Sequence, residues 1–339
     1  MGYSKEIKND FLKLIEKEND IMTISKELKI SPYEVMGLVS SFNDNGVNIA
    51  IKKTSDNIFM VYMGDLEYQE RNTYKFDTDE SNEFKFILIA DTRFGSKSQQ
   101  LSILNDIYTK GHKMGYDNAI VCGNISAGLY PLTDVNAETN FLDDTYSQID
   151  YIVNNYPKIK DMKTFFITGK TDSKHLKQEK VNIGKRIADA RKDMIYLGDI
   201  SCEVLIDKVQ MQVLSSKLNK TYTSSYRPQQ QIDSYRSEDK PDILLYGGLL
   251  QMEKFTYRNV VCITVPSVVA TTKEMTEKRY SNTVGAWYVT VKTNEKGKLD
   301  SVRALSSSYY RTIDDDYLKA KPLKDTPKKV KKLGGKNGK

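Results

Sequence analysis

One apolar run followed by an aspartate limits the folds open to this chain more than any other feature. Residues 84–90 are apolar at six of seven positions, and Asp91 follows directly. A nearly continuous apolar run is typical of a strand that is buried on both faces of an α/β sheet. In open α/β sheets, ligands bind at the carboxyl ends of such strands. The sequence therefore predicts an α/β fold with a site beside Asp91.

Three later segments repeat this pattern of an apolar strand followed by a loop of small residues. Their loops lie at residues 123–124, 169–172 and 247–250. Helices are predicted over 98–114 and 136–155, and strands predominate in the second half of the chain. Alternating strands and helices followed by many strands indicate a two-sheet α/β sandwich. We expect the four strand ends to meet at one site.

Residues 1–64 are predicted to form a separate small domain. Apolar residues at helical spacing over 4–18, a short helix over 23–28 and a helix over 32–42 precede two strands that flank residues 55–57. Ser31 is a good N-cap for the third helix, and Pro32 suits its first position. This order of elements resembles a winged helix-turn-helix.

DNA binding through the third helix is the common role of that family. The charges of this segment argue for another role. Residues 1–64 hold eight lysines against nine acidic residues, and no Lys or Arg lies between Ser31 and Ile51. Because non-specific affinity for DNA comes mainly from basic contacts to phosphate, a protein-contact or scaffolding role is the alternative.

The remaining boundaries follow from composition. Residues 65–83 are predicted to be an acidic linker, 84–312 the large domain and 313–339 a basic disordered tail. The net charge of the whole chain is +6. Residues 321–339 alone contribute +7, since they hold eight lysines against Asp325, so the rest is nearly neutral. The lysines predicted to contact nucleic acid or acidic proteins are Lys321, Lys324, Lys328, Lys329, Lys331 and Lys332. A merely solubilising tail is the alternative.

Composition also excludes several classes of protein. No apolar run approaches the ~18 residues that a membrane-spanning helix needs, and the first residues do not form a signal peptide. Cys122, Cys202 and Cys262 lie in apolar runs without paired spacing, which favours reduced core thiols in a cytosolic setting. The 22 tyrosines suit protein interfaces, or else ordinary half-buried strand positions.

The order of the four loops resembles the calcineurin-like metallophosphoesterases. In that family the strand ends carry D-x-H, G-D, G-N-H-D and G-H-x-H, and a lone His precedes the last motif. The family's residues hold two metal ions about 3.5–4 Å apart, which activate water and clamp a phosphate. Segments 191–198, 221–229, 257–260 and 284–287 also resemble a subgroup that is carried by phages and bacteria. That subgroup is exonuclease-like and has an N-terminal winged helix, and the resemblance covers about residues 1–310.

The departures from the family pattern decide what the resemblance implies. The family's metal-site positions are held here by Asp91, Arg93, Asn124, Lys170, Thr171, Asp172, Gly248 and Leu250. By this resemblance, Asp91 is the one metal ligand of the family that this sequence retains. Asp172 also matches the motif, but the family's residue at that position does not bind metal. His112 and His175 are the two histidines of the sequence, and each is expected to be solvated or locally hydrogen-bonded. Transition metals need imidazole and carboxylate donors that are free of competing cations, so no metal, no cofactor and no two-metal catalysis are expected.

Two interpretations of the altered site remain open. In the structural one, Arg93 or Lys170 pairs with Asp91 and replaces the metals as the central positive charge. In the functional one, Arg93 and Lys170 form a pocket for phosphate or a nucleic-acid backbone.

The overall hypothesis is a metallophosphoesterase-like protein without catalysis that works by binding. The resemblance suggests a phage virion structural or assembly component, in the host cytoplasm or the virion, which contacts proteins or further copies of itself and touches DNA through its tail. A DNA-binding accessory of repair or replication is the second hypothesis, and a residual DNA exonuclease is the third.

Overall fold

The large domain consists of two six-stranded sheets that pack face to face. The computed structural model describes residues 3–45, 47–53, 58–64, 73–130, 139–217 and 223–320. The first sheet has the order β15-β14-β5-β6-β7-β8, formed by β5 (Glu83–Ile89), β6 (Asn118–Cys122), β7 (Lys163–Thr168), β8 (Met194–Asp199), β14 (Gly285–Thr293) and β15 (Leu299–Ser308). The second has the order β12-β13-β11-β10-β9-β4, formed by β4 (Tyr74–Phe76), β9 (Ser201–Ile206), β10 (Val209–Ser215), β11 (Ile243–Gly247), β12 (Glu253–Tyr257) and β13 (Val260–Thr264). The predicted two-sheet α/β sandwich is confirmed.

The apolar runs of the sequence form the core between these sheets. Phe86, Ile120 and Ile167 of the first sheet face Val213 and Leu245 of the second, and all five side chains are fully buried. Strands β5, β6, β7 and β8 run parallel, as do β10, β11 and β13. Their carboxyl ends therefore lie at one edge, as the sequence predicted.

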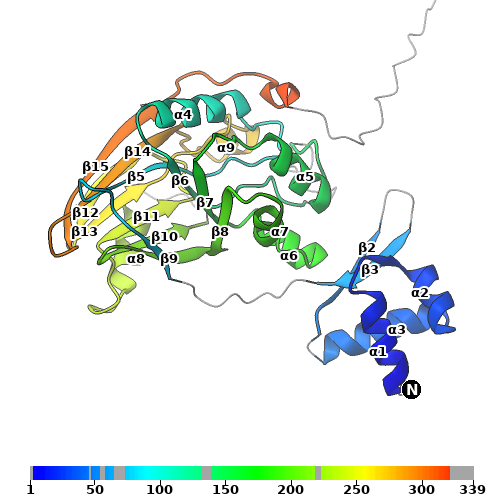
Figure 1. The fold of residues 1–339 in the computed structure, drawn as a ribbon. Helices are drawn as coiled ribbons and strands as arrows, with labels where there is room; N and C mark the ends of the chain where they lie inside the picture. Colours follow the sequence, from blue (N-terminus) through cyan, green and yellow to red (C-terminus); the bar gives the residue numbers. More distant parts are fainter. Residues whose placement is uncertain are drawn as a thin grey trace, which may run out of the picture.

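Helices cover the outer faces of the two sheets. Figure 1 shows the sheets as stacked layers, with α4 over the first sheet and α8 under the second. A second hydrophobic core lies between the outer face of the first sheet and helices α4, α5 and α7. A smaller apolar cluster lies between the second sheet and α8. The helices of the large domain are α4 (Leu101–Lys113), α5 (Thr145–Asn155), α6 (Ser173–Glu179), α7 (Ile183–Ala190), α8 (Tyr226–Ser234), α9 (Lys273–Glu277) and the 3-10 helix η1 (Asp316–Lys319).

In its described residues, the N-terminal domain has three helices and a three-stranded antiparallel sheet in the order β1-β3-β2. Its elements are α1 (Lys5–Leu14), β1 (Asn19–Asp20), α2 (Ile21–Leu28), α3 (Pro32–Asp44), β2 (Ile49–Lys53) and β3 (Phe59–Met63). The capping of α3 is as predicted, because the Ser31 side chain accepts from the Glu34 amide and Pro32 opens the helix. The helices and the hairpin occur in the predicted order. Assignment to the winged helix-turn-helix family stays a prediction.

Two predicted boundaries differ from the structure. Strand β4 pairs with β9, so the described residues from 73 onward belong to the large domain and not to a linker, while residues 65–72 lie outside the described part. At the other end, the large domain does not stop at residue 312. Asp316 is fully buried, and its carboxylate accepts hydrogen bonds from the amide and hydroxyl of Ser102 at 2.7 and 2.5 Å. The six tail lysines named above lie outside the described residues.

Within the described residues, no helix has the length and apolar character needed to cross a membrane.

Candidate functional site

The loops that follow β5 and β6 continue side by side beyond the ends of their strands. The Asp91 amide donates to the Gly123 carbonyl at 3.0 Å, and the Arg93 amide donates to the Asn124 carbonyl at 3.1 Å. Asp91, Arg93 and Asn124 all have left-handed backbones, with φ of 50°, 42° and 55°. Such angles are uncommon for residues with side chains, and they often mark functional sites. They place the three side chains together at the edge of the sheet.

The second sheet joins this edge at the ends of β10 and β11. The Ser216 amide donates to the Gly247 carbonyl at 3.0 Å. A Cβ on Gly247 would lie 2.4 Å from the Cys122 carbonyl oxygen, so the two sheets approach closely here. All four predicted strand ends therefore meet.

Asp91 pairs with a cation of its own loop. Its side chain is 1% exposed, and its Oδ1 accepts hydrogen bonds from Arg93 Nε at 3.1 Å and Nη2 at 2.9 Å. The Asn124 amide nitrogen donates to the same oxygen at 3.1 Å. Asp91 Oδ2 is buried and has no hydrogen-bond partner among the described residues. We call Asp91, Arg93, Asn124 and Thr171 the strand-end cluster.

The electrostatics of the cluster follow from burial and from this pairing. Burial raises the pKa of Asp91. The charge of Arg93, its hydrogen bonds to Asp91 and the hydrogen bond from the Asn124 side chain offset part of that rise. Burial also disfavours the charged form of Arg93, but the attraction of Asp91 outweighs it, so the pKa of the guanidinium is raised. With both Nε and Nη2 on Asp91 Oδ1, the contact has the geometry of an ion pair.

Of the two neighbouring positions 170 and 171, Thr171 joins the cluster and Lys170 does not. Thr171 donates to Asn124 Oδ1 from its amide at 3.0 Å and from its hydroxyl at 3.1 Å, and the hydroxyl also reaches the Ser126 carbonyl at 2.9 Å. Lys170 is exposed, and it forms no ion pair within the described ranges. Of the two predicted cations, only Arg93 contacts Asp91. The anion pocket of Arg93 and Lys170 stays a prediction.

Asp172 lies beside the cluster as the centre of a second network. Its two carboxylate oxygens accept from the amides of Ile125, Ser126 and Gly169 at 3.1, 2.8 and 2.8 Å, and from the Ser126 hydroxyl at 2.6 Å. Burial raises the pKa of Asp172 to about 6, although these hydrogen bonds favour the charged form. The carboxylate thereby ties the loop after β6 to the loop after β7.

His175 extends the Asp172 network toward α5. Its Nε2 is 3.0 Å from the Ser126 hydroxyl, and its Nδ1 is 2.8 Å from the Thr145 hydroxyl. The ring is fully buried, and burial lowers its pKa to about 3. His175 is locally hydrogen-bonded, which was one of the two predicted outcomes, whereas His112 is half-exposed and contacts Asp117 at 2.6 Å. We call Asp172, Ser126, His175 and Thr145 the Asp172 network.

The positions of the family's last two histidine ligands cannot supply a donor here. Gly248 has φ of 88°, and a Cβ there would lie 2.2 Å from the Ser216 carbonyl oxygen. Leu250 is fully buried and packs with Val269 and Met275. The backbone and the packing at this end of the site are therefore built for residues without metal-binding side chains.

The residues present do not fit a two-metal centre. Asp91 is bound by a guanidinium, and the Asn124 and Thr171 side chains are bonded to each other. Among the described residues, no group of three or more His, Cys, Asp or Glu side chains could hold a metal ion. The donor chemistry required for the family's metals is replaced by a fixed positive charge.

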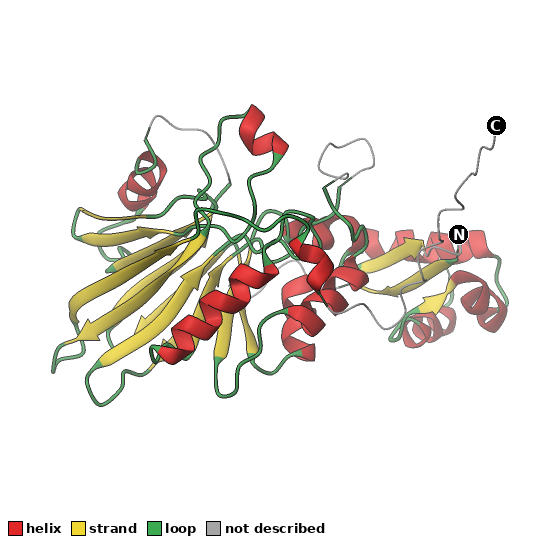
Figure 2. Cartoon of the chain, turned by 90° about the horizontal axis from the view of Figure 1, so that it is seen from above, coloured by secondary structure: helices red, strands yellow, loops and turns green. Residues whose placement is uncertain are grey.

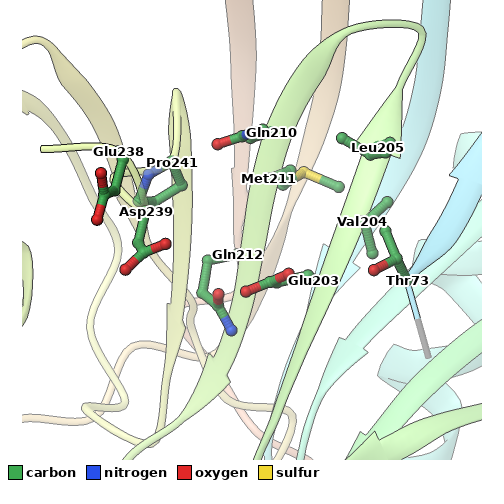
Figure 3. Close-up of a pocket in the computed structure, with 10 residues that line it drawn as sticks. All are labelled: Thr73, Glu203, Val204, Leu205, Gln210, Met211, Gln212, Glu238, Asp239 and Pro241. Atoms are coloured by element: carbon green, nitrogen blue, oxygen red, sulfur yellow. The ribbon is translucent and has the colours of Figure 1, made fainter. Parts of the chain in front are cut away.

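A pocket of about 200 Å³ lies elsewhere, against β9 and β10 of the second sheet (Figure 3). Glu203 and Gln212 line it and are paired across the two strands, and Glu238 and Asp239 line it from the chain before β11. None of the ten residues that line it is a predicted site residue. Sequence reasoning gave no signal for this pocket, since its residues come from unremarkable polar positions of two strands and a loop.

Comparison with known proteins gives structural likeness only. No family model and no curated protein matches the chain. Similar solved structures are an archaeal phosphodiesterase, the phosphoesterase Yfce from E. coli, and Vps29 from Entamoeba histolytica complexed with Zn²⁺. Their identities to this chain are 12%, 11% and 9%, and their TM-scores are 0.38, 0.33 and 0.33. They cover 66%, 65% and 66% of this chain and 100%, 98% and 99% of their own.

At these identities and TM-scores, the likeness has no bearing on activity, metal or partner. The strand order of the chain stands on its own. Two six-stranded sheets pack face to face, with the chemistry-bearing loops at the carboxyl ends of the parallel strands. This is the two-sheet architecture that the resemblance to the calcineurin-like metallophosphoesterases implies.

Proposed function

We propose that this protein is a metallophosphoesterase-like protein that acts by binding and not by catalysis. The observation that carries the proposal is the pairing of Arg93 with the buried Asp91 carboxylate, at 2.9 Å. A metal ion at Asp91 would have to displace a guanidinium that is fixed to the same carboxylate. Mutual attraction of two charges in a poorly solvated site makes that displacement costly.

The backbone supports the same proposal independently. A side chain at position 248 conflicts with the Ser216 carbonyl, so a His ligand there requires a rearranged loop. Loss of catalysis would then be built into the backbone and not only into the side chains.

The fuller form of the proposal is a phage virion structural or assembly component. Its support is indirect: the resemblance noted for the sequence, the number of tyrosines suited to interfaces, and the lysine-rich residues 321–339, whose charge suits DNA or acidic proteins. Co-purification of the protein with virions is the expected result. Its absence from virions would leave the binding role and remove this setting.

The decisive test measures metal content and Mn²⁺-dependent hydrolysis of a generic phosphodiester by the purified chain. We expect neither stoichiometric metal nor turnover above that of a matched Asp91→Ala variant. About two metal ions per chain, with turnover that Asp91→Ala abolishes, would overturn the proposal and favour the exonuclease hypothesis.

A DNA-binding accessory is the second candidate, and one observation favours it. Lys170 is exposed, and the Arg93 side chain is 20% exposed, on neighbouring loops of the same edge. DNA binding that weakens with salt, persists without residues 321–339 and falls in Lys170→Ala is expected of this candidate. Binding that disappears with the tail alone would count against it.

A further inference from the structure

The sheet of the N-terminal domain is covered on both faces. Ile49 and Val61 point into the domain's own helices, where they pack with residues such as Phe11 and Leu38. Ala50 and Tyr62 lie on the opposite face, yet each is only 4% exposed, and both pack in the core that joins α4, α5 and α7 to the first sheet. Figure 2 shows this small sheet directly beside helices of the large domain. The second face is therefore buried against the large domain.

Tyr62 makes the specific contacts of this interface. Its hydroxyl donates to the Glu179 carbonyl, the last residue of α6, at 2.6 Å. Its ring meets the ring of Tyr146, in the first turn of α5, edge to face at 6.5 Å. Just beyond β3, a Cβ on Gly64 would lie 2.9 Å from Lys180 Cβ, so the two backbones approach closely. The N-terminal domain thus holds the carboxyl end of α6.

The other end of α6 belongs to the network beside the strand-end cluster. Asp172 immediately precedes the helix and accepts from the Ile125 and Ser126 amides of the neighbouring loop and from the Gly169 amide of its own loop. His175, within the first turn, is held between Ser126 and Thr145. This seven-residue helix therefore has one end fixed by the site loops and the other by Tyr62.

We infer that the N-terminal domain is a brace for α6, and that its protein partner is the large domain of its own chain. The hydrogen bond from Tyr62 to the Glu179 carbonyl and the packing of Tyr62 on Tyr146 hold the carboxyl end of α6 in place. The hydrogen bonds of Asp172 hold its start. Because the helix is short, neither end can open alone without loosening the other. The inference goes beyond the proposed function and does not depend on whether the strand-end cluster is catalytic.

A charge argument favours this brace over a DNA-reading module. No Lys or Arg lies between Ser31 and Ile51, a stretch that contains all of α3, and Glu34 occupies the first turn of that helix. Affinity for phosphate depends on basic residues. The face of its sheet that carries Ala50 and Tyr62 is buried against the large domain instead.

The test is hydrogen–deuterium exchange of backbone amides in the full chain, comparing wild type with Tyr62→Ala. We expect exchange in residues 173–180 to accelerate about tenfold or more, and the loop 169–172 to follow, because opening of α6 becomes easier. Tyr33→Ala is the matched control, since Tyr33 is 89% exposed in the same domain. It should leave α6 unchanged, and α8 should be unaffected in both variants.

Two further measurements keep the test decisive if Tyr62→Ala does not fold. Tyr62→Phe retains the ring and removes only the hydroxyl, so a smaller acceleration confined to α6 and its flanking loop is expected. By reciprocity of coupling, Asp172→Asn should also accelerate exchange in β3. Unchanged exchange of α6 in a folded Tyr62 variant, with faster exchange in the N-terminal domain alone, would overturn the inference and leave an independent module.

Discussion

Asp91 and Asp172 are two aspartates in neighbouring loops, each 1% exposed, and the protein satisfies them in opposite ways. Asp172 receives four neutral donors distributed over both of its oxygens. Asp91 receives a guanidinium and an amide on one oxygen, and its other oxygen has no partner in the described structure. Asp172 is held mainly by backbone amides, and Asp91 is held by the guanidinium of Arg93.

This difference separates a carboxylate that holds the loops in place from one that lies in the strand-end cluster. By the resemblance, Asp172 corresponds to a residue that does not bind metal, and its network joins two loops and begins α6. Asp91 corresponds to a metal ligand, and it is kept by an internal positive charge. Asp172 therefore ties the loops together, while Asp91 is paired with Arg93.

The largest effect is expected for Asp172→Ala. Three buried backbone amides and the Ser126 hydroxyl would lose their acceptor, and each unsatisfied buried group is costly. We expect the free energy of unfolding to fall by about 3–5 kcal/mol in chemical denaturation. Asp172→Asn, which keeps one acceptor oxygen, should cost less. Equal stability of wild type and Asp172→Ala would remove the contrast between the two aspartates.

Asp91→Ala is expected to have a somewhat smaller effect. The change leaves Arg93 without its partner, but that side chain is 20% exposed and can turn partly toward water. A loss of about 2–4 kcal/mol is expected by thermal or denaturant unfolding. In a double-mutant cycle with Arg93→Ala, the two losses should be far from additive. Wild-type-like unfolding of Asp91→Ala would contradict the structural role of this pair.

Gly248→His tests whether the altered site can be restored by its side chain. The new Cβ would collide with the Ser216 carbonyl, and the positive φ adds backbone strain. We expect a loss of about 2–3 kcal/mol and no gain of metal. Gly115→Ala is the matched control, because Gly115 has φ of 80° and open space around its Cβ position. Stoichiometric binding of Mn²⁺ or Zn²⁺ by the stable variant would show that the loop can still accept a ligand.

The pH dependence of stability separates His175 from Asp172. The folded-state pKa of His175, about 3, lies below its ordinary 6.5, so the folded protein resists protonation and loses stability as pH falls below 6.5. The pKa of Asp172 is raised to about 6 from 3.8, so its protonation favours the folded state as pH falls from 6 toward 4. These two contributions oppose each other in that window.

Replacing His175 by Gln should therefore reduce the loss of stability between pH 7 and pH 5. We expect the loss in wild type to exceed that in the variant by about 1–2 kcal/mol, measured by urea unfolding at both pH values. An identical pH dependence of the two proteins would mean that His175 is not buried in its neutral form.

The apolar strands were predictable because their signal is local. The run at residues 84–90 became β5, and the similar runs became β6, β7 and β11. Residues 136–138 of the predicted helix lie outside the described residues; among the rest, α5 begins at Thr145, because the Asp144 side chain caps it by accepting from the Ser147 amide. The meeting of the four loops followed from parallel strands alone.

The arrangement inside the site was less predictable, because it depends on contacts distant in sequence. The motif pattern named Asp91, Arg93 and Asn124, and pairing of Asp91 with Arg93 or Lys170 was one of two hypotheses. The motif pattern could not predict which of the two cations pairs with Asp91, because the solvent exposure of each side chain depends on the tertiary structure. The roles of Ser126 and Tyr62 were missed altogether. Strand β3 is apolar at all five positions, which fits burial on both faces, but the pattern does not indicate which part of the chain covers the second face.

The cap of α4 has a consequence for how the chain is made. Gln100 provides no side-chain cap for this helix, and the Ser102 amide is instead bound by Asp316, 214 positions later. A carboxylate at a helix start stabilises the exposed amides and the dipole of the first turn. On the ribosome, α4 is therefore synthesised long before its cap, and its first turn stays open until the strands in between have been translated. Shortening the protein at residue 312 would leave that turn open permanently, so the damage would appear in the first helix of the large domain and not at the new end.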